Sequence, residues 1–316
     1  MPFMKLTTMG ITTPLAISLQ TILAIESAVA FLANGFILVV NGHRWIQNRK
    51  MAPCDFLLTS LSTSRIMLQL TILTINILYL NSAESGMRTY GQDIGTFLWL
   101  FLSNASLWCA TWLNVFYCVK VTNFPHHLFL WLKLRIDVLA PRLLGMVIIS
   151  LMFFSVHPTI LYFEAKKAFN LSGTLTRNDS LSKVCHNPFF VFNTLQFFSI
   201  CMSFILSVAA SMVLLISLWR HRKNMKKSGS VIKDLSTQVY LNLMKSLLFS
   251  LLIDITYFAT LIIPVSGYFR YAAYDGFSLT VVLSAIPSAH TIILILSNPK
   301  LKEILLRILN IRNVAS

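Results

Sequence analysis

The stretch LAISLQTILAIESAVAFLANGFILVVN, residues 15–41, contains a single charged side chain, Glu26. A helix needs about 20 mostly apolar residues to cross the hydrocarbon core of a bilayer. The apolar core of a cleavable signal peptide is shorter, at about 7–15 residues. We therefore expect this stretch to be retained as a membrane span.

Comparable apolar runs recur along the rest of the chain. Backbone groups in lipid must bond within their own segment, so each run is predicted to be a helix. The predicted spans are residues 15–41, 54–79, 94–118, 138–163, 188–219, 237–264 and 274–297. The run 188–219 is long, and we expect it to project beyond the bilayer. The sequence shows no internal repeat and predicts one all-α membrane domain, a seven-transmembrane helix bundle, over residues 1–316.

The composition excludes a water-soluble fold. Charged residues make up 12% of the chain and the mean hydropathy is +0.70, whereas soluble proteins carry about 25% charged residues. The net charge of +15 therefore concerns membrane orientation first, and no nucleic-acid partner is expected. Motifs of soluble enzymes, such as G-x-S-x-G and H-E-x-x-H, are absent, so the sequence predicts no enzyme, no metal and no cofactor.

Basic residues divide unequally between the two ends of the predicted bundle. Most of the 26 Lys and Arg residues fall in the 1–2, 3–4 and 5–6 loops and in the tail. The positive-inside rule then places the N-terminus outside and the tail in the cytosol. Two glycosylation sequons, at Asn170 and Asn178, fall in the 4–5 loop, which the same rule places outside.

The tail segment 299–311 is predicted to form a short amphipathic helix on the cytosolic leaflet. Leu301 and Leu305 share one face, opposite Lys302 and Arg307. The alternative is a simple stop-transfer tail.

Charged groups inside the spans cost at least about 2.5–3.5 kcal/mol each, so each requires a partner or a function. The helix rise of about 1.5 Å per residue puts Glu26 and Arg65 within reach of each other, and we expect a pair or a shared water network. The alternative is that each snorkels or bonds to backbone separately. Asn34 and His290 are predicted at an inner depth with Arg65, as a polar layer for helix packing or a switch rather than proton transfer.

Polar and aromatic side chains also gather toward the outer half of the predicted spans. Counting from residue 237 places Asp254 about 25 Å above the inner end of its helix. A few polar groups among aromatics suit a small-molecule pocket, although Trp and Tyr also act as anchors at membrane interfaces. The candidate ligand-binding residues are Asn76, Trp99, Ser103, Asn104, Gln196, Asp254, Tyr257, Thr280 and Leu283.

Several motifs in a fixed order carry a family resemblance. They are NGFILVVNG (34–42), LTSLSTSRIMLQL (58–70), LWCATWLNVFYCVKVTNF (107–124), RHRKNMKKSGSVIKDLSTQVY (220–240) and PSAHTIILILSNPKLKEIL (287–305). From about residue 20 to residue 309 the chain resembles the type-two taste receptors, the bitter taste receptor family of seven-helix G-protein-coupled receptors. The lack of Asp-Arg-Tyr and Asn-Pro-x-x-Tyr signatures fits this family.

The resemblance implies a plasma-membrane receptor with an agonist site in the outer half of the bundle. By position, the family's helix-3 aromatic falls on Trp99, and the Asn one turn deeper falls on Ser103, with Asn104 beside it. Asp254 stands where the family often has Tyr, and a carboxylate there would favour cationic ligands. The Pro common in helix 5 corresponds to Ser203, so a straighter helix 5 is expected.

The resemblance also implies a heterotrimeric G protein with a gustducin-like α subunit at the inner surface. The candidate contacts are Lys120, Arg220, Arg222, Lys226 and Tyr240, the last in place of a family His. Orientation and attraction to anionic membrane lipid explain the same basic residues without a protein partner.

Three rival functions remain at this point. The nearest is a pheromone-type chemosensory receptor. A seven-helix transporter or proton pump would use Asp254, Lys245 and His290 as a relay, but transporters tend to show internal repeats and broken helices. A membrane-embedded enzyme would need clustered metal ligands or a nucleophile–base pair, and neither is evident.

Overall fold

The computed structural model describes residues 14–81, 85–122, 127–171, 180–227, 233–265 and 273–309, and all regular structure in them is helical. The helices are α1 (Pro14–Asn48), α2 (Pro53–Asn81), α3 (Ser85–Val121), α4 (His127–Leu171), α5 (Ser180–Lys227), α6 (Lys233–Val265), α7 (Ala273–Ser297) and α8 (Pro299–Ile308). Within these residues, seven helices, α1–α7, contain apolar stretches long enough to cross a membrane. The predicted all-α seven-helix fold is therefore confirmed, whereas the orientation of its termini stays a prediction.

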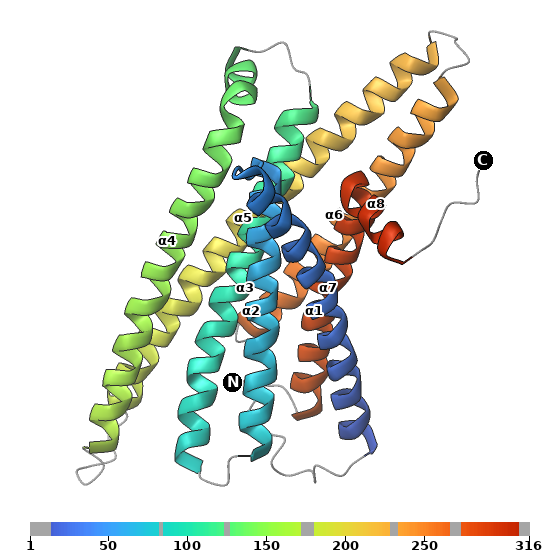
Figure 1. Cartoon of the computed structure of the whole chain (residues 1–316). Helices are drawn as coiled ribbons and strands as arrows, with labels where there is room; N and C mark the ends of the chain where they lie inside the picture. The colour runs from blue at the N-terminus through green and yellow to red at the C-terminus, as the bar shows by residue number, and fades with distance from the viewer. Residues whose placement is uncertain are drawn as a thin grey trace.

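Several helices extend well beyond the spans predicted from hydropathy. The prediction 138–163 becomes α4 from His127 to Leu171, and 237–264 becomes α6 from Lys233. Hydropathy detects only the apolar part of a helix, while Lys, Arg and Gln continue a helix readily outside the hydrocarbon. Figure 1 shows the ends of α5 and α6 projecting past the level of α8, while the projection of the fifth run beyond the bilayer stays a prediction.

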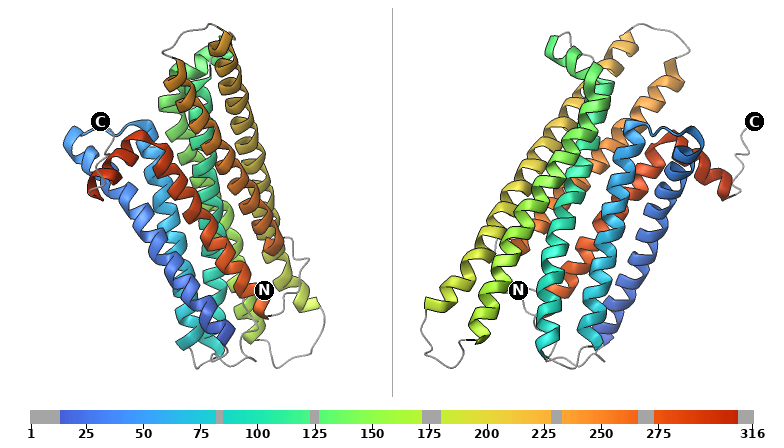
Figure 2. Two further views of the ribbon diagram at one scale, coloured as in Figure 1. Left: turned by 90° about the vertical axis from the view of Figure 1, so that its right-hand side faces the viewer. Right: turned by 60° about the vertical axis from the view of Figure 1, so that its left-hand side comes forward.

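Neighbouring helices close into a bundle. α3 packs against α2, α4 and α5, α7 packs against α1 and α6, and α1 also contacts α2. Figure 2 shows this bundle from two further sides, with α8 turning away at one end of α7. We call the end of the bundle that carries α8 the inner end, because the charge count predicts it to face the cytosol.

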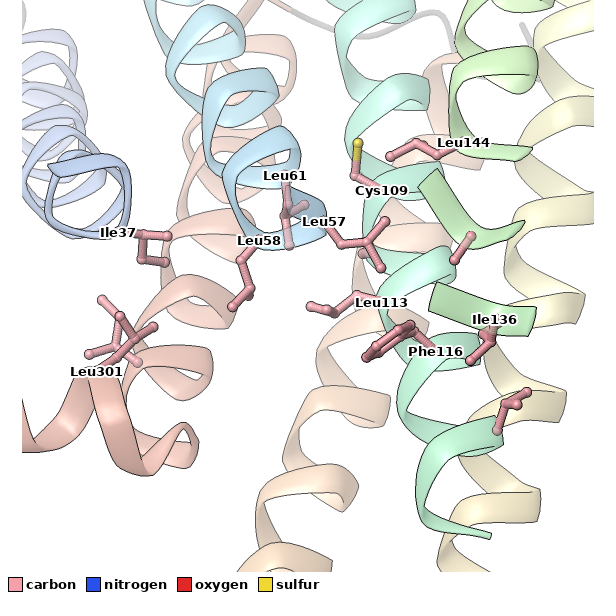
Figure 3. Close-up of a cluster of buried hydrophobic side chains, with 14 of the residues drawn as sticks. Ile37, Leu57, Leu58, Leu61, Cys109, Leu113, Phe116, Ile136, Leu144 and Leu301 are labelled. Atoms are coloured by element: carbon pink, nitrogen blue, oxygen red, sulfur yellow. The ribbon is translucent and has the colours of Figure 1, made fainter. Parts of the chain in front are cut away.

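Two apolar clusters fill the bundle. The inner apolar cluster includes Ile37, Leu57, Leu58, Leu113 and Leu301, and Figure 3 shows Leu301 of α8 beside Ile37 of α1. The outer apolar cluster includes Leu68, Ile72, Phe97, Trp99, Phe192, Tyr257, Leu261 and Leu283. Because α8 contributes to the inner apolar cluster, it belongs to the packed bundle and not only to its surface.

The sequence of α8 explains where it starts and how it sits. Asn298 caps the helix, its side chain accepting from the Lys300 and Leu301 backbone N–H groups. Leu301 is 1% exposed, whereas Lys302 and Arg307 are exposed on the other side. The predicted amphipathic helix is confirmed, although it ends at Ile308 and the predicted residues 310–311 lie outside the described residues.

The outside of the bundle suits lipid. Leu32, Leu134 and Ile149 are 75%, 77% and 71% exposed. Exposed hydroxyl groups, such as those of Thr63 and Thr256, donate to the carbonyl four residues earlier in their own helix, at 2.8 Å in both cases. Polar groups on this surface therefore find partners where lipid offers none.

Helix α5 runs without a break through Ser203, where the family's Pro would stand. The Ser203 hydroxyl donates to the Ile200 carbonyl at 2.9 Å, and the Thr111 hydroxyl of α3 donates to the Ser203 carbonyl at 3.1 Å. Ser203, at the position where a Pro would disrupt the helix, thus joins α5 to α3 through its backbone carbonyl.

Candidate functional site

Four buried side chains form an inner polar network across α1, α2 and α7: Asn34, Arg65, His290 and Thr291. Arg65 Nη1 donates to Thr291 Oγ1 at 2.7 Å, and Arg65 Nη2 lies 2.7 Å from His290 Nδ1. Thr291 Oγ1 in turn lies 3.0 Å from Asn34 Oδ1. The structure therefore brings together the three residues that depth arithmetic grouped, and it adds Thr291, which sequence reasoning missed although it directly follows His290.

The geometry fixes the tautomer of His290. A guanidinium group has only donors, so His290 Nδ1 must accept from Arg65. The imidazole is then neutral and carries its proton on Nε2. Nε2 is buried and has no hydrogen-bond partner among the described residues.

Glu26 has a different partner from the one expected. The Ser284 hydroxyl of α7 donates to Glu26 Oε2 at 2.7 Å, while Arg65 is held by His290 and Thr291. The expected direct Glu26–Arg65 pair is wrong for the part of the chain that the structure describes. Helix rise gives the height of a side chain but not its direction around the axis, and Glu26 points to α7 instead of α2.

A second group of polar side chains, the half-buried Asn114 with the buried Ser207 and Asp254, joins α3, α5 and α6; we call it the Asp254 cluster. Asp254 Oδ2 accepts from Asn114 Nδ2 at 3.2 Å and from Ser207 Oγ at 3.1 Å. Asn114 Nδ2 also donates to Ser207 Oγ at 2.8 Å. Sequence reasoning missed Asn114 and Ser207, although an amide in the middle of an apolar run was visible.

The expected outer depth of Asp254 is wrong. Its partner Asn114 lies ten residues closer to the inner end of α3 than Asn104, which is about 15 Å along the helix. Asp254 therefore lies at the depth of Asn114, further toward the inner end than Asn104.

A small cavity separates the inner polar network from the Asp254 cluster. It is lined by Arg65, Asp254, Tyr257 and His290, among others, and offers ≈ 10 Å³ to the centre of a water molecule. This volume corresponds to about one water and is far below the 300–1,000 Å³ of small-molecule pockets. Buried Arg65 Nε, like His290 Nε2, makes no hydrogen bond to the described residues.

Asn104 and Gln196 use their hydrogen-bonding groups inside the bundle. Asn104 Nδ2 donates to Gln196 Oε1 at 2.6 Å, and Gln196 Nε2 donates to Ser155 Oγ at 2.9 Å. Ser199 Oγ donates to Asn104 Oδ1 at 3.2 Å. Both amides are buried, so this chain of bonds ties α3, α4 and α5 together.

The other predicted ligand-binding residues lie apart from this chain of bonds. Trp99, Tyr257 and Leu283 belong to the outer apolar cluster, with Tyr257 also lining the small cavity. Ser103 and Thr280 are buried. The Asn76 side chain donates to the Ile72 carbonyl of its own helix at 3.0 Å.

The predicted G-protein contacts and glycosylation sites are only partly described. Lys120 forms a salt bridge with Asp137 at 2.6 Å, which links α3 to α4. Arg220 is exposed and Arg222 is half-buried at the inner end of α5. The side chains of Lys226, Tyr240 and Asn170, and the whole of Asn178, lie outside the described residues.

Comparison with known proteins places this arrangement in a family. The family described as Taste receptor protein (TAS2R) matches residues 12–313. The chain belongs to the type-two taste receptor family. It is 34% identical to mouse (Mus musculus) taste receptor type 2 member 7 over 294 residues, covering 90% of this chain and 91% of the relative. It is 31% identical to human (Homo sapiens) taste receptor type 2 member 2 over 306 residues, covering 93% and 98%.

A solved structure supports the fold of this taste receptor. The crystal structure of squid rhodopsin matches with a TM-score of 0.55 at 13% sequence identity, covering 94% of this chain and 87% of that chain. Together with the family, it makes the chain a multi-pass membrane protein of the G-protein-coupled receptor class, with small-molecule ligands and G-protein coupling, and not an enzyme.

Proposed function

We propose that this taste receptor detects bitter small molecules in the outer half of its helical bundle and activates a gustducin-like heterotrimeric G protein at the plasma membrane. The observation that carries the mechanism is the division of buried hydrogen bonds into two groups. The inner polar network joins α1, α2 and α7, and the Asp254 cluster joins α3, α5 and α6.

The two groups face each other across the small cavity. Arg65 and Asp254 both line it, yet no salt bridge within 4.0 Å joins them in the described residues. Hydrogen bonds are strong within each group, but no ion pair joins Arg65 to Asp254. This difference favours movement of α5 and α6 relative to α1, α2 and α7. Packed interfaces of this kind switch between discrete arrangements rather than deforming continuously.

The outer apolar cluster supplies the coupling to an agonist. Tyr257 lies three residues after Asp254 on α6. Because residues three apart share a helix face, the two side chains are neighbours on α6. An agonist that inserts near Trp99 and Leu283 and displaces Tyr257 acts on the next turn of α6. It shifts the equilibrium only by the difference in its affinity for the two states.

Asn104 and Gln196 act in this proposal through helix packing. Their mutual bond holds α3 to α5 just below the predicted agonist depth. A ligand that repacks α5 changes this bond without needing to touch either amide.

The inner ends of α5 and α6 form the proposed G-protein surface. Arg220 is exposed there, and the predicted contacts Arg222, Lys226 and Tyr240 follow on the same two helices. A shift of α5 and α6 moves this basic surface relative to α1, α2 and α7, while the salt bridge between Lys120 and Asp137 joins α3 to α4.

The test is calcium release in cells that express the chain with a chimeric gustducin-like α subunit. We expect several bitter compounds to elicit responses, and we expect Tyr257→Ala to change their potency. Thr256→Val is the matched control, because Thr256 is exposed on the neighbouring face and its hydroxyl bonds to the Leu252 carbonyl. The absence of any response to a broad set at verified surface expression would overturn the proposal.

The same experiment separates the rivals. A pheromone-type receptor would respond to another ligand set with the same α subunit. A relay through Asp254, Lys245 and His290 is disfavoured because the Lys245 side chain is exposed, whereas Asp254 and His290 are buried.

A further inference from the structure

An open cleft lies at the inner end of the bundle, away from the proposed agonist and G-protein sites. It is formed by the end of α1, the start of α2 and the start of α8, and its volume is ≈ 460 Å³. This volume falls in the range of about 300–1,000 Å³ that small-molecule sites occupy. The cleft is therefore large enough for a polar ligand of several functional groups.

The cleft is strongly basic. Arg44, Lys50 and Lys300 line it, and Asp55 is its one acidic lining residue. The salt bridges formed within the described residues involve none of these three cations. The cleft thus has three cations that form no ion pair among the described residues and a single carboxylate. This arrangement suits an anionic group such as a phosphate ester.

A buried amide at the edge of the cleft points to hydroxyl groups on the same ligand. Asn41 is 1% exposed and lines the cleft. Its Nδ2 donates to the Asp55 carbonyl and to Thr59 Oγ1, both at 3.2 Å, but its Oδ1 has no partner among the described residues. A buried carbonyl oxygen without a donor is unfavourable, and a ligand hydroxyl would satisfy it.

The flank of the cleft carries exposed apolar side chains. Trp45 lines the cleft and is 55% exposed, and the adjacent Ile46 is 74% exposed. Trp is enriched where a helix passes through the headgroup layer. A headgroup in this cleft would thus have its acyl chains beside α1, in the leaflet that the charge count predicts to be cytosolic.

We propose that this cleft binds the headgroup of an anionic phospholipid that carries both phosphate and hydroxyl groups, of the phosphoinositide class. Arg44, Lys50 and Lys300 hold the phosphates, and Asn41 Oδ1 accepts from a ring hydroxyl. Basic pockets between helices on the cytoplasmic side of a membrane bind such headgroups in other proteins.

The test is photo-crosslinking of the purified full-length chain, in phosphatidylcholine nanodiscs, to a diazirine-bearing phosphatidylinositol bisphosphate. Each cation near the headgroup contributes a factor of about five to binding. Lys300→Gln is expected to raise the half-saturating lipid fraction about fivefold, and the triple variant with Arg44→Gln and Lys50→Gln about 100-fold. Lys302→Gln is the matched control, because Lys302 is exposed on α8 and does not line the cleft.

A second variant changes the binding in the opposite direction. Asp55→Asn removes the one carboxylate of the cleft, so it is expected to strengthen labelling several-fold. Opposite effects of Lys300→Gln and Asp55→Asn separate loss of binding from loss of folding, and no G protein or agonist is needed for the measurement.

Three outcomes would overturn the proposal. The first is equal labelling of the wild-type chain and the triple variant. The second is an equal loss with Lys302→Gln, which would indicate non-specific attraction to the membrane surface. The third is competition by inorganic phosphate or a soluble inositol phosphate at the concentration of the lipid, which would make the cleft a soluble-anion site.

Discussion

Asn114 of α3 and Asp254 of α6 provide a direct measure of how firmly α6 is held. Their side chains meet at 3.2 Å between Nδ2 and Oδ2, where Asp254 is buried and Asn114 is half-buried. Interhelical hydrogen bonds in membranes contribute about 0.6 kcal/mol on average and about 1.7 kcal/mol at most. We expect a coupling of about 1 kcal/mol between Asn114→Ala and Asp254→Ala in a double-mutant cycle.

The two single substitutions are expected to lower the stability of the receptor by different amounts. Asn114→Ala removes one donor from Asp254, whereas Asp254→Ala removes the acceptor of Ser207 and one of the two acceptors of Asn114. An unsatisfied buried group costs about 1–3 kcal/mol. At roughly 2–4 °C per kcal/mol, Asp254→Ala should lower the unfolding midpoint by about 5 °C and Asn114→Ala by about 3 °C. The double variant should fall short of their sum by about 2 °C.

The midpoint can be followed with a thiol-reactive dye, because Cys109 and Cys118 are free and buried, at 2% and 7% exposed. Thr256→Val on the lipid-facing side of α6 serves as control and should shift the midpoint by less than about 2 °C. Strict additivity of the two alanine substitutions, with the control unchanged, would refute the idea that this bond holds α6 to α3.

Two further predictions concern helix packing. An added Cβ at Gly95 would lie 2.5 Å from Ile75 Cγ1, whereas Gly35 has open space around it. Gly95→Ala should therefore destabilise the receptor by about 1–3 kcal/mol, and Ile75→Ala should offset part of the loss, while Gly35→Ala should be neutral or stabilising by about 0.5–1 kcal/mol. Gln196→Leu should cost about 1–3 kcal/mol by unpairing Asn104, seen as a lower unfolding midpoint, and an unchanged midpoint would contradict a structural role for this pair.

The sequence was sufficient for the number of spans and for the inner polar layer. Each span exceeds the length that lipid demands, and polar residues such as Asn34 and Arg65 stand out against an apolar background. Their heights follow from helix rise alone, so grouping them with His290 required no knowledge of packing.

Partners and exact depths were harder to predict, for two physical reasons. Heights do not give the direction of a side chain around the helix axis, which is why Glu26 bonds to Ser284 and not to Arg65. A count of residues from one end of a predicted span also assumes where the membrane begins, and the contact with Asn114 places Asp254 deeper than that count gave. The agonist site depends on both quantities for several helices at once, so composition alone could suggest its residues but not assemble them.

Leu301 packs α8 into the inner apolar cluster with residues of α1 and α2, while Asn298 caps α8 immediately after α7. The short helix is thus held by packing at Leu301 and is connected directly to the end of α7. A fluorophore or spin label on its exposed side, at Arg307 for example, would translate a small displacement of α7 into a larger change of angle. Arg307 is thus an attachment point for recording activation that is none of the residues proposed to contact ligand or G protein.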